Sequence, residues 1–218
     1  SFKSDNSQVS NTKVNYNGKL NLNPFNLTLD ASVQKINLKK LFKNSAIFLE
    51  LIKSGKLFHE NLNIIVSLNS SNISNSKVLD SLKINFNAIN GEIDFNKSFI
   101  LSNKIGVLKT NNSRLIIDKN ILLFDGNFNL DIKDSNSFFS FFQTPKKFRK
   151  QIKNISFNLN YNFFENKLTV SDFKIDKIQP EGGVLDILND FNLDANHQIS
   201  NLIIFKNLVN NLFSVYEG

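Results

Sequence analysis

Few side chains in this sequence are of the types that carry acid–base, nucleophilic or metal chemistry. There are two histidines, His59 and His197, and no cysteine. Neither histidine stands at a metal-ligand spacing from another ligating residue. Glu92 and Asp94 fall on one face of an expected strand, and paired carboxylates can hydrolyse glycosides. Sugar sites usually add aromatic platforms, however, and this chain has no Trp and only three Tyr. We therefore expect no enzymatic activity, no metal and no cofactor.

The composition is that of a globular protein. The chain has 218 residues, of which 41% are hydrophobic and 21% are charged, so it can bury a sizeable core. We find no Pro-, Gly- or Ser-rich linker and expect one domain over residues 1–218. The sequence begins at Ser1 and contains no Met. We expect it to be a piece of a longer protein whose membrane anchor lies outside it.

The net charge of +7 does not by itself predict a nucleic-acid partner. Nucleic-acid binders cluster Arg and Lys on one face, whereas this chain has only Arg114 and Arg149, with Lys scattered along it. We expect no nucleic-acid binding. The densest basic run lies between Lys146 and Lys153. It is either a solvated helix face or a contact for anionic lipid head groups or phosphates.

Alternation of apolar and polar residues with a period of two is the strongest structural signal. This pattern is typical of strands with one buried face and favours an antiparallel sheet. Asn90-Gly91 predicts a hairpin turn, and a slip between Val170 and Phe173 indicates a bulge. Asp125-Gly126 is a further turn or bulge signal. The clearest alternating stretches are residues 14–22, 25–33, 62–68, 82–88, 128–132, 155–163 and 168–175.

Four segments have helical spacing instead. Helices are expected near 39–53, 137–150, 184–191 and 200–216, the second as two short helices separated by a turn at Pro145. No apolar run approaches the ~18–20 residues that a membrane-spanning helix needs. The expected fold is mainly β (β-rich α+β), with about ten strands in a curved antiparallel sheet or groove and about four helices packed on it.

The apolar sheet face allows two interpretations that periodicity cannot separate. It is either an ordinary core covered by helices, or a concave groove that stays partly open and holds acyl chains. If it is a groove, residues from the cleanest alternations are expected to line it. These are Ile84, Phe86, Phe128, Leu130, Phe157, Leu159 and Tyr161.

The order of these features resembles the C-terminal region of the AsmA family of bacterial envelope proteins, as found in AT-rich alphaproteobacteria. The likeness covers most of the chain but includes no catalytic motif. It is carried by the strand-turn-strand residues Gly18–Phe25, the helix 38–57 with Lys39-Lys40-Leu41-Phe42, Phe124–Phe128, the segment Ser140–Lys147 with Asn154–Tyr161, and the terminal helix from Asn207 to Gly218.

The resemblance implies a periplasmic protein whose full-length form is anchored in the inner membrane. AsmA-like proteins are similar to TamB and the bridge-like lipid-transfer proteins, in which antiparallel strands form an apolar groove that carries phospholipid between the inner and outer membranes. The expected function is therefore non-enzymatic lipid handling in outer-membrane biogenesis, with phospholipid as the partner. The alternative is a structural or interaction module, such as a surface or adhesin fragment, that holds no ligand.

Overall fold

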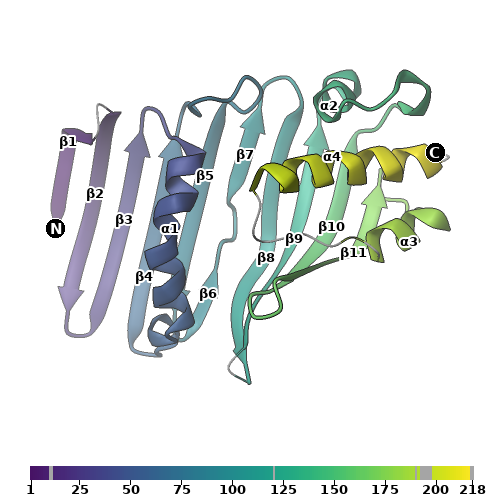
Figure 1. The fold of residues 1–218 in the computed structure, drawn as a ribbon. Coiled ribbons are helices and arrows are strands. Elements are labelled where there is room, and N and C mark those ends of the chain that lie inside the picture. Colours follow the sequence, from purple (N-terminus) through teal and green to yellow (C-terminus); the bar gives the residue numbers. More distant parts are fainter. Residues whose placement is uncertain (10–11, 120, 190, 192–197, 217–218) are drawn as a thin grey trace.

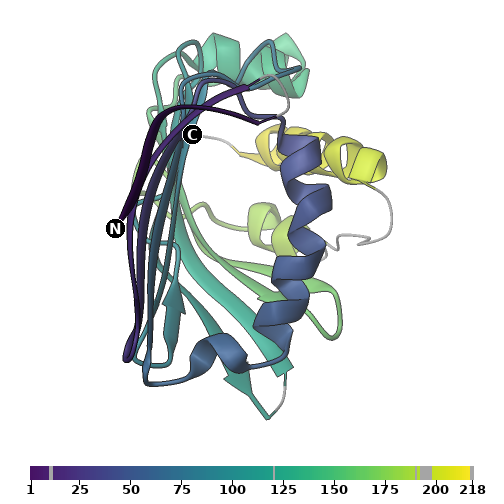
Figure 2. The same cartoon turned by 90° about the vertical axis from the view of Figure 1, so that its left-hand side faces the viewer.

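A single curved sheet with helices on one face forms the body of the protein. In a computed structural model, which describes residues 1–9, 12–119, 121–189, 191 and 198–216, the sheet contains eleven strands. The helices lie in front of it in Figure 1, and the side view in Figure 2 shows that this is the concave side. The mainly β fold with a helix-covered curved sheet is thus confirmed.

The elements follow one another almost in the order of the sheet. The strands are β1 (Phe2–Val9), β2 (Thr12–Leu22), β3 (Phe25–Val33), β4 (Leu62–Ser70), β5 (Ser81–Ile89), β6 (Glu92–Asp94), β7 (Phe99–Ser102), β8 (Gly106–Asp118), β9 (Ile121–Ile132), β10 (Asn154–Asn162) and β11 (Lys167–Ile175). The helices are α1 (Leu38–Lys53), α2 (Ser135–Phe142), α3 (Gly183–Asn189) and α4 (Gln198–Val215), with short 3₁₀ turns η1 (Lys56–Phe58) and η2 (Lys146–Phe148).

Neighbouring strands are antiparallel with one exception, the β3–β4 pair, which is parallel. A parallel pair needs a crossover connection between its strands, and α1 with η1 supplies it. Strands β1 and β7 were not expected from the sequence. β1 is an edge strand with Ser, Asp and Asn in its middle, and β7 is four residues long.

Residues at turns and bulges have the backbone angles that these features require, and they fix the strand register. Asn90 and Gly91 both have positive φ, 50° and 79°, which is the conformation of the expected hairpin turn between β5 and β6. The predicted bulge in β11 is present, with Asp172 at φ 48°. Gly126, by contrast, lies within β9, and the register shift occurs in the facing strand β8. A Cβ on Gly126 would come within 3.1 Å of the Cβ of Ser113.

The two sheet faces differ completely in chemistry. On the concave side, three clusters of buried apolar residues lie under the helices. On the opposite side, asparagine amides hydrogen-bond across neighbouring strands. The Nδ2 of Asn154 donates to the Oδ1 of Asn129 at 2.8 Å, and the Nδ2 of Asn87 donates to the Oδ1 of Asp94 at 2.9 Å. These bonds satisfy polar side chains that are poor strand formers.

The helices are fixed by side-chain caps. Asn37 accepts a hydrogen bond from the backbone N of Lys40 at the start of α1. Asp134 accepts from the N of Asn136 and the N of Ser137 at the start of α2. The bond from the Ser137 hydroxyl, opposed by partial desolvation, leads the contributions that lower the pKa of the Asp134 carboxyl. The expected break at Pro145 is also found, since α2 ends before it and η2 follows it.

Candidate functional site

The helical cover on the concave face has two separate parts. One part is α1 and η1, which pack over β4 and β5 around Ile52, Leu57 and Phe86. The other part is α2, α3 and α4, which enclose a cluster centred on Phe139 and Phe213. In the central strands, Ile93, Leu115 and Leu122 are buried, whereas other apolar side chains of β8, β9 and β10 are only half-buried.

A row of phenylalanine rings joins the two covered clusters, because Phe95 and Phe124 pack against the α1 cluster and Phe157 packs against the cluster under α2, α3 and α4. We call Phe95, Phe124, Phe128 and Phe157 the aromatic row; all four are half-buried. Ring centroids are 6.2 Å apart for Phe95–Phe124 and for Phe124–Phe128, and 5.4 Å apart for Phe128–Phe157. The last pair is stacked at 12° because the two residues are directly opposite in the β9–β10 register. At the α1 side, the row continues onto buried Phe86 at 5.7 Å.

At its other end, the aromatic row reaches an apolar pocket beneath α4. The pocket has a volume of about 100 Å³, and its thirteen lining residues are all Leu, Ile, Val or Phe. Phe157 and Leu130 form part of its floor on the sheet, while Phe205 and Leu208 of α4 and Phe142 of α2 lie around it. Ligand pockets for whole small molecules are usually ~300 Å³ or larger. The pocket alone is therefore too small to enclose a whole small molecule.

The seven residues expected to line a groove fall into three groups. Ile84 and Phe86 belong with the clusters near α1, and Phe86 is only 7% exposed, so it is part of the core there. Leu130 and Phe157 line the pocket. Three residues, Phe128, Leu159 and Tyr161, are half-buried and belong to none of the three buried clusters.

Sequence reasoning missed Phe95 and Phe124 of the aromatic row and every helical residue of the pocket. Phe124 is in register with Tyr161 across β9 and β10, so the two strands could have indicated it once their pairing was known. Phe95 lies just after β6, where alternation is too short to show which face it occupies. The pocket residues of α4 depend on how that helix docks on the sheet.

No charged residue lines the pocket. On β10, the hydroxyl of half-buried Tyr161 donates to the Oδ1 of Asn166 at 3.2 Å. Burial raises the pKa of the Tyr161 hydroxyl because it disfavours the phenolate. The site can therefore hold apolar chains, and it supplies a donor only at its margin.

The residues considered for acid–base chemistry lie elsewhere. Glu92 and Asp94 line a hollow of about 750 Å³ on the opposite, polar side of the sheet. There the Oδ1 of Asp94 accepts from the backbone N of Asn96 at 2.8 Å as well as from Asn87. His59 is exposed, and its Nδ1 accepts from the N of Asn61. His197 lies outside the described residues.

Two further features are absent from the described part of the chain. No group of three or more His, Cys, Asp or Glu side chains is placed to hold a metal ion. No helix there is long and apolar enough to cross a membrane. Comparison with known proteins also found no matching family model, curated protein or solved structure.

Proposed function

We propose that this protein is a non-enzymatic segment of a bacterial envelope protein that holds or conducts phospholipid between the inner and outer membranes. The observation that carries the proposal is the aromatic row, which stays half-buried while it joins the two covered clusters and leads into an all-apolar pocket. The resemblance to AsmA-like proteins is consistent with a periplasmic place and an inner-membrane anchor for the full-length form.

The energetics favour an acyl chain as the occupant. Soluble proteins rarely leave large contiguous apolar surfaces exposed unless those surfaces bind something. Each CH₂ group moved from water onto this face contributes ~0.8 kcal/mol, so even a few carbons seated in the pocket and on the aromatic row give useful affinity. We call the pocket and the aromatic row together the cleft. The polar head group of a lipid needs no charged partner inside the cleft, because it can remain in water at the edge of the aromatic row.

The test is a negative charge introduced at Leu159, on the half-buried part of the apolar sheet face. Leu159 faces Gly126 and Val170 in the sheet register and belongs to none of the three buried clusters. We expect Leu159→Asp to fold, because water can reach the half-buried carboxylate. It should also lose bound phospholipid by at least about tenfold, since an acyl chain cannot cover that carboxylate without a large desolvation cost. Native mass spectrometry of the purified protein measures the bound lipid.

Asn160→Asp is the matched control. It adds the same charge to the next position of β10, where the side chain is exposed and points to the opposite face. This variant should retain lipid at the wild-type level. The proposal fails if the wild-type protein and Asn160→Asp carry no lipid, which would favour an interaction module. It also fails if Leu159→Asp unfolds by circular dichroism, which would make this face a closed core.

A further inference from the structure

The positive charge of this protein is concentrated at one end of the sheet. Because every neighbouring strand pair except β3–β4 is antiparallel, five connections in the described part of the chain meet at this end: residues 34–37, 71–80, 103–105, 133–153 and 176–182. They contain ten Lys or Arg residues against four Asp or Glu, a formal excess of six positive charges. We call these five connections the basic end. Most of this charge comes from the segment between β9 and β10, which contains Lys133, Lys146, Lys147, Arg149, Lys150 and Lys153.

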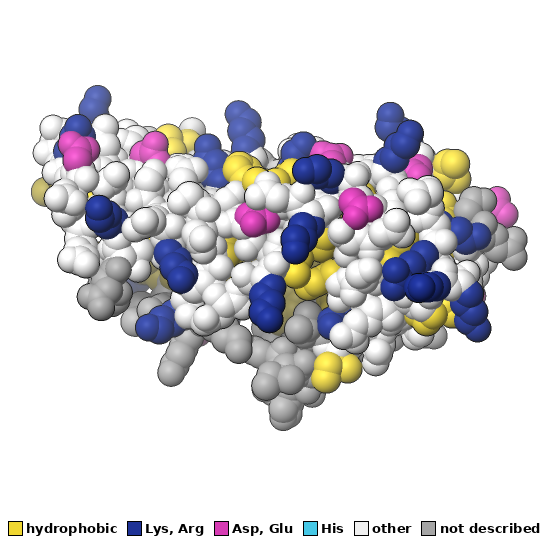
Figure 3. Space-filling model, turned by 90° about the horizontal axis from the view of Figure 1, so that it is seen from above, with side chains coloured by type: hydrophobic (Ala, Val, Ile, Leu, Met, Phe, Trp, Pro, Cys, Tyr) yellow, Lys and Arg dark blue, Asp and Glu magenta, His cyan; other side chains and the backbone are white. Residues whose placement is uncertain are grey.

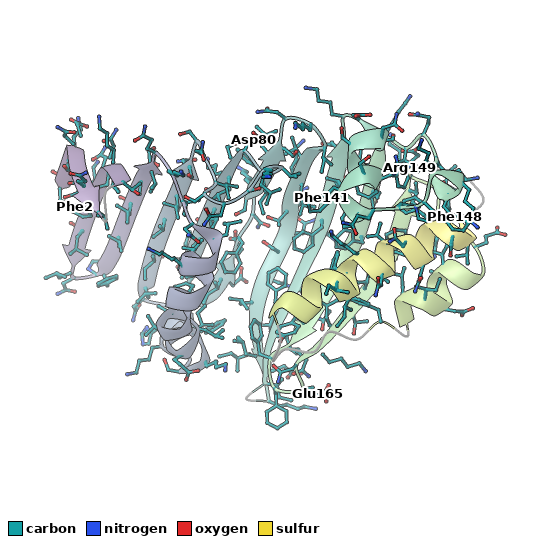
Figure 4. The ribbon with its side chains drawn as sticks, turned by 45° about the horizontal axis from the view of Figure 1, so that its top comes forward. Phe2, Asp80, Phe141, Phe148, Arg149 and Glu165 are labelled. Carbon is teal, nitrogen blue, oxygen red and sulfur yellow. The ribbon has the colours of Figure 1, made fainter. Side chains whose placement is uncertain are left out.

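The opposite end of the sheet has no such excess. Its described connecting residues are 23–24, 54–61, 90–91, 119 and 163–166. Together they contain two Lys and two Glu, so their formal charge is zero. Figure 4 shows both ends: Asp80 and Arg149 are labelled at the upper one, and Glu165 at the lower one. The molecule is therefore polarised along its strands.

The basic end places aromatic rings beside its cations. The Nζ of Lys147 lies 4.7 Å from the ring centroid of Phe148, and the Nζ of Lys206 on α4 lies 5.9 Å from that of Phe141. The Nε of Arg149 donates to the O of Thr144 at 2.9 Å. A carbonyl acceptor orients the guanidinium without neutralising its charge. Figure 4 shows Phe141, Phe148 and Arg149 in one region above α4.

The apolar pocket is close to this end. Phe138 and Phe142 of α2, which belongs to the connection between β9 and β10, line it together with Ile155 near the start of β10. Figure 3 looks onto the basic end, and hydrophobic side chains are visible there between the Lys and Arg side chains. The pocket therefore lies beneath the connection that carries most of the basic charge.

We propose that the basic end docks on a membrane surface rich in anionic lipids. This inference rests partly on the proposed function, because it makes the docked end the one nearest the lipid pocket. Positive charge draws the end to the anionic surface, and each Lys near such a surface contributes about fivefold to the binding constant. Nine of the ten cations are Lys, which suits a diffuse surface of head groups better than the bidentate base contacts that Arg makes in nucleic acids.

The test uses vesicle co-sedimentation with phosphatidylcholine alone or mixed with phosphatidylglycerol. Lys146 and Lys147 are both exposed, so Lys146→Gln/Lys147→Gln should fold normally. We expect the wild-type protein to bind only the anionic vesicles and to be released by added salt. The double variant should bind about 25-fold more weakly, from about fivefold for each Lys. Lys56→Gln/Lys119→Gln is the control, because it removes two exposed Lys from the uncharged end; its binding should stay within about twofold of wild type.

Three outcomes would overturn docking: binding to neutral vesicles as strong as to anionic ones, equal losses in the two double variants, or preference for duplex nucleic acid over anionic vesicles. Failure of the lipid cleft is distinguishable from failure of docking. Leu159→Asp should keep vesicle binding while losing bound lipid, and Lys146→Gln/Lys147→Gln should keep bound lipid while losing vesicle binding.

Discussion

Asparagine shapes this protein at the residue scale. The chain has 37 Asn, a residue that is depleted in strands because it hydrogen-bonds locally and packs poorly. Here the amide side chains form hydrogen bonds between neighbouring strands. The Nδ2 of Asn69 donates to the Oδ1 of Asp30, and the hydroxyl of Ser67 donates to the Oδ1 of Asn85. The polar face thus adds side-chain hydrogen bonds to the backbone ladder, while the opposite face supplies the hydrophobic stabilisation.

Tyr161 gives a prediction at the same scale. Burial raises its pKa above the usual value of 10.0. The neutral phenol is therefore favoured in the folded state, and its stabilising effect is fully present below pH 10. That effect is lost as the pH rises through the folded-state pKa. The free energy of unfolding should consequently fall more steeply above pH 10 in the wild-type protein than in Tyr161→Phe. Urea denaturation at a series of alkaline pH values measures this.

A spectroscopic titration separates this effect from general alkaline unfolding. The absorbance of tyrosinate in the wild-type protein, minus that in Tyr161→Phe, reports Tyr161 alone. The midpoint of the difference curve should lie above that of free tyrosine and rise further when lipid occupies the cleft, because the ring is then more deeply desolvated. Equal slopes in the two unfolding series, or a midpoint at the ordinary value, would contradict burial of the hydroxyl.

At the scale of elements, alternation predicted most strands and helical spacing predicted the four helices. The features that these two patterns did not predict have physical causes. β1 has apolar residues only at its two ends, so its pairing with β2 comes from backbone hydrogen bonds rather than from a buried face. β3 and β4 are parallel because α1 and η1 return the chain to the end of the sheet at which β3 begins. Neither feature leaves a periodic signal in the sequence.

The sequence also could not predict which part of the apolar sheet face stays half-buried. Phe86 and Phe128 stand in equally clean alternating stretches, yet Phe86 is core beneath α1, whereas Phe128 is half-buried and belongs to none of the three buried clusters. The difference arises from where the helices dock, which depends on contacts between distant segments. Periodicity predicts which face of a strand is apolar, but it does not predict which other elements cover that face.

Besides its apolar contacts, α4 is joined by a partly buried hydrogen bond to the residue Thr144 just after α2, which gives a prediction for this element. Thr144 is 1% exposed, and its hydroxyl donates to the Oδ1 of Asn210 on α4 at 2.7 Å. Thr144→Val keeps the shape but leaves that amide oxygen without its donor, which should reduce the free energy of unfolding by about 1–3 kcal/mol. Urea denaturation gives the loss. Thr144→Ser, which retains the hydroxyl, should lose less, and equal losses in the two variants would show that packing of the methyl group is what matters.

On the scale of the whole molecule, the sheet extends well beyond its helical cover. None of the described residues in the three buried clusters comes from β1, β2 or β3. Leu20 and Leu22 of β2 are 44% and 75% exposed. These three strands are therefore held mainly by the backbone ladder, at the side of the sheet farthest from α3 and α4 in Figure 1. Stability should accordingly be graded across the sheet.

Hydrogen exchange should reveal this gradient, because amides open in units whose free energies follow local burial. We expect β1 to exchange fastest, β2 and β3 next, and β8 to β10 slowest. β11 is the matched comparison, since it is the other edge of the sheet but buries Leu168, Phe173 and Ile175. Its peptides should exchange at least about tenfold more slowly than those of β1, a difference of ~1.4 kcal/mol in opening free energy. Exchange measured by mass spectrometry decides between this gradient and a sheet that opens as one unit, in which the two edges would be equally protected.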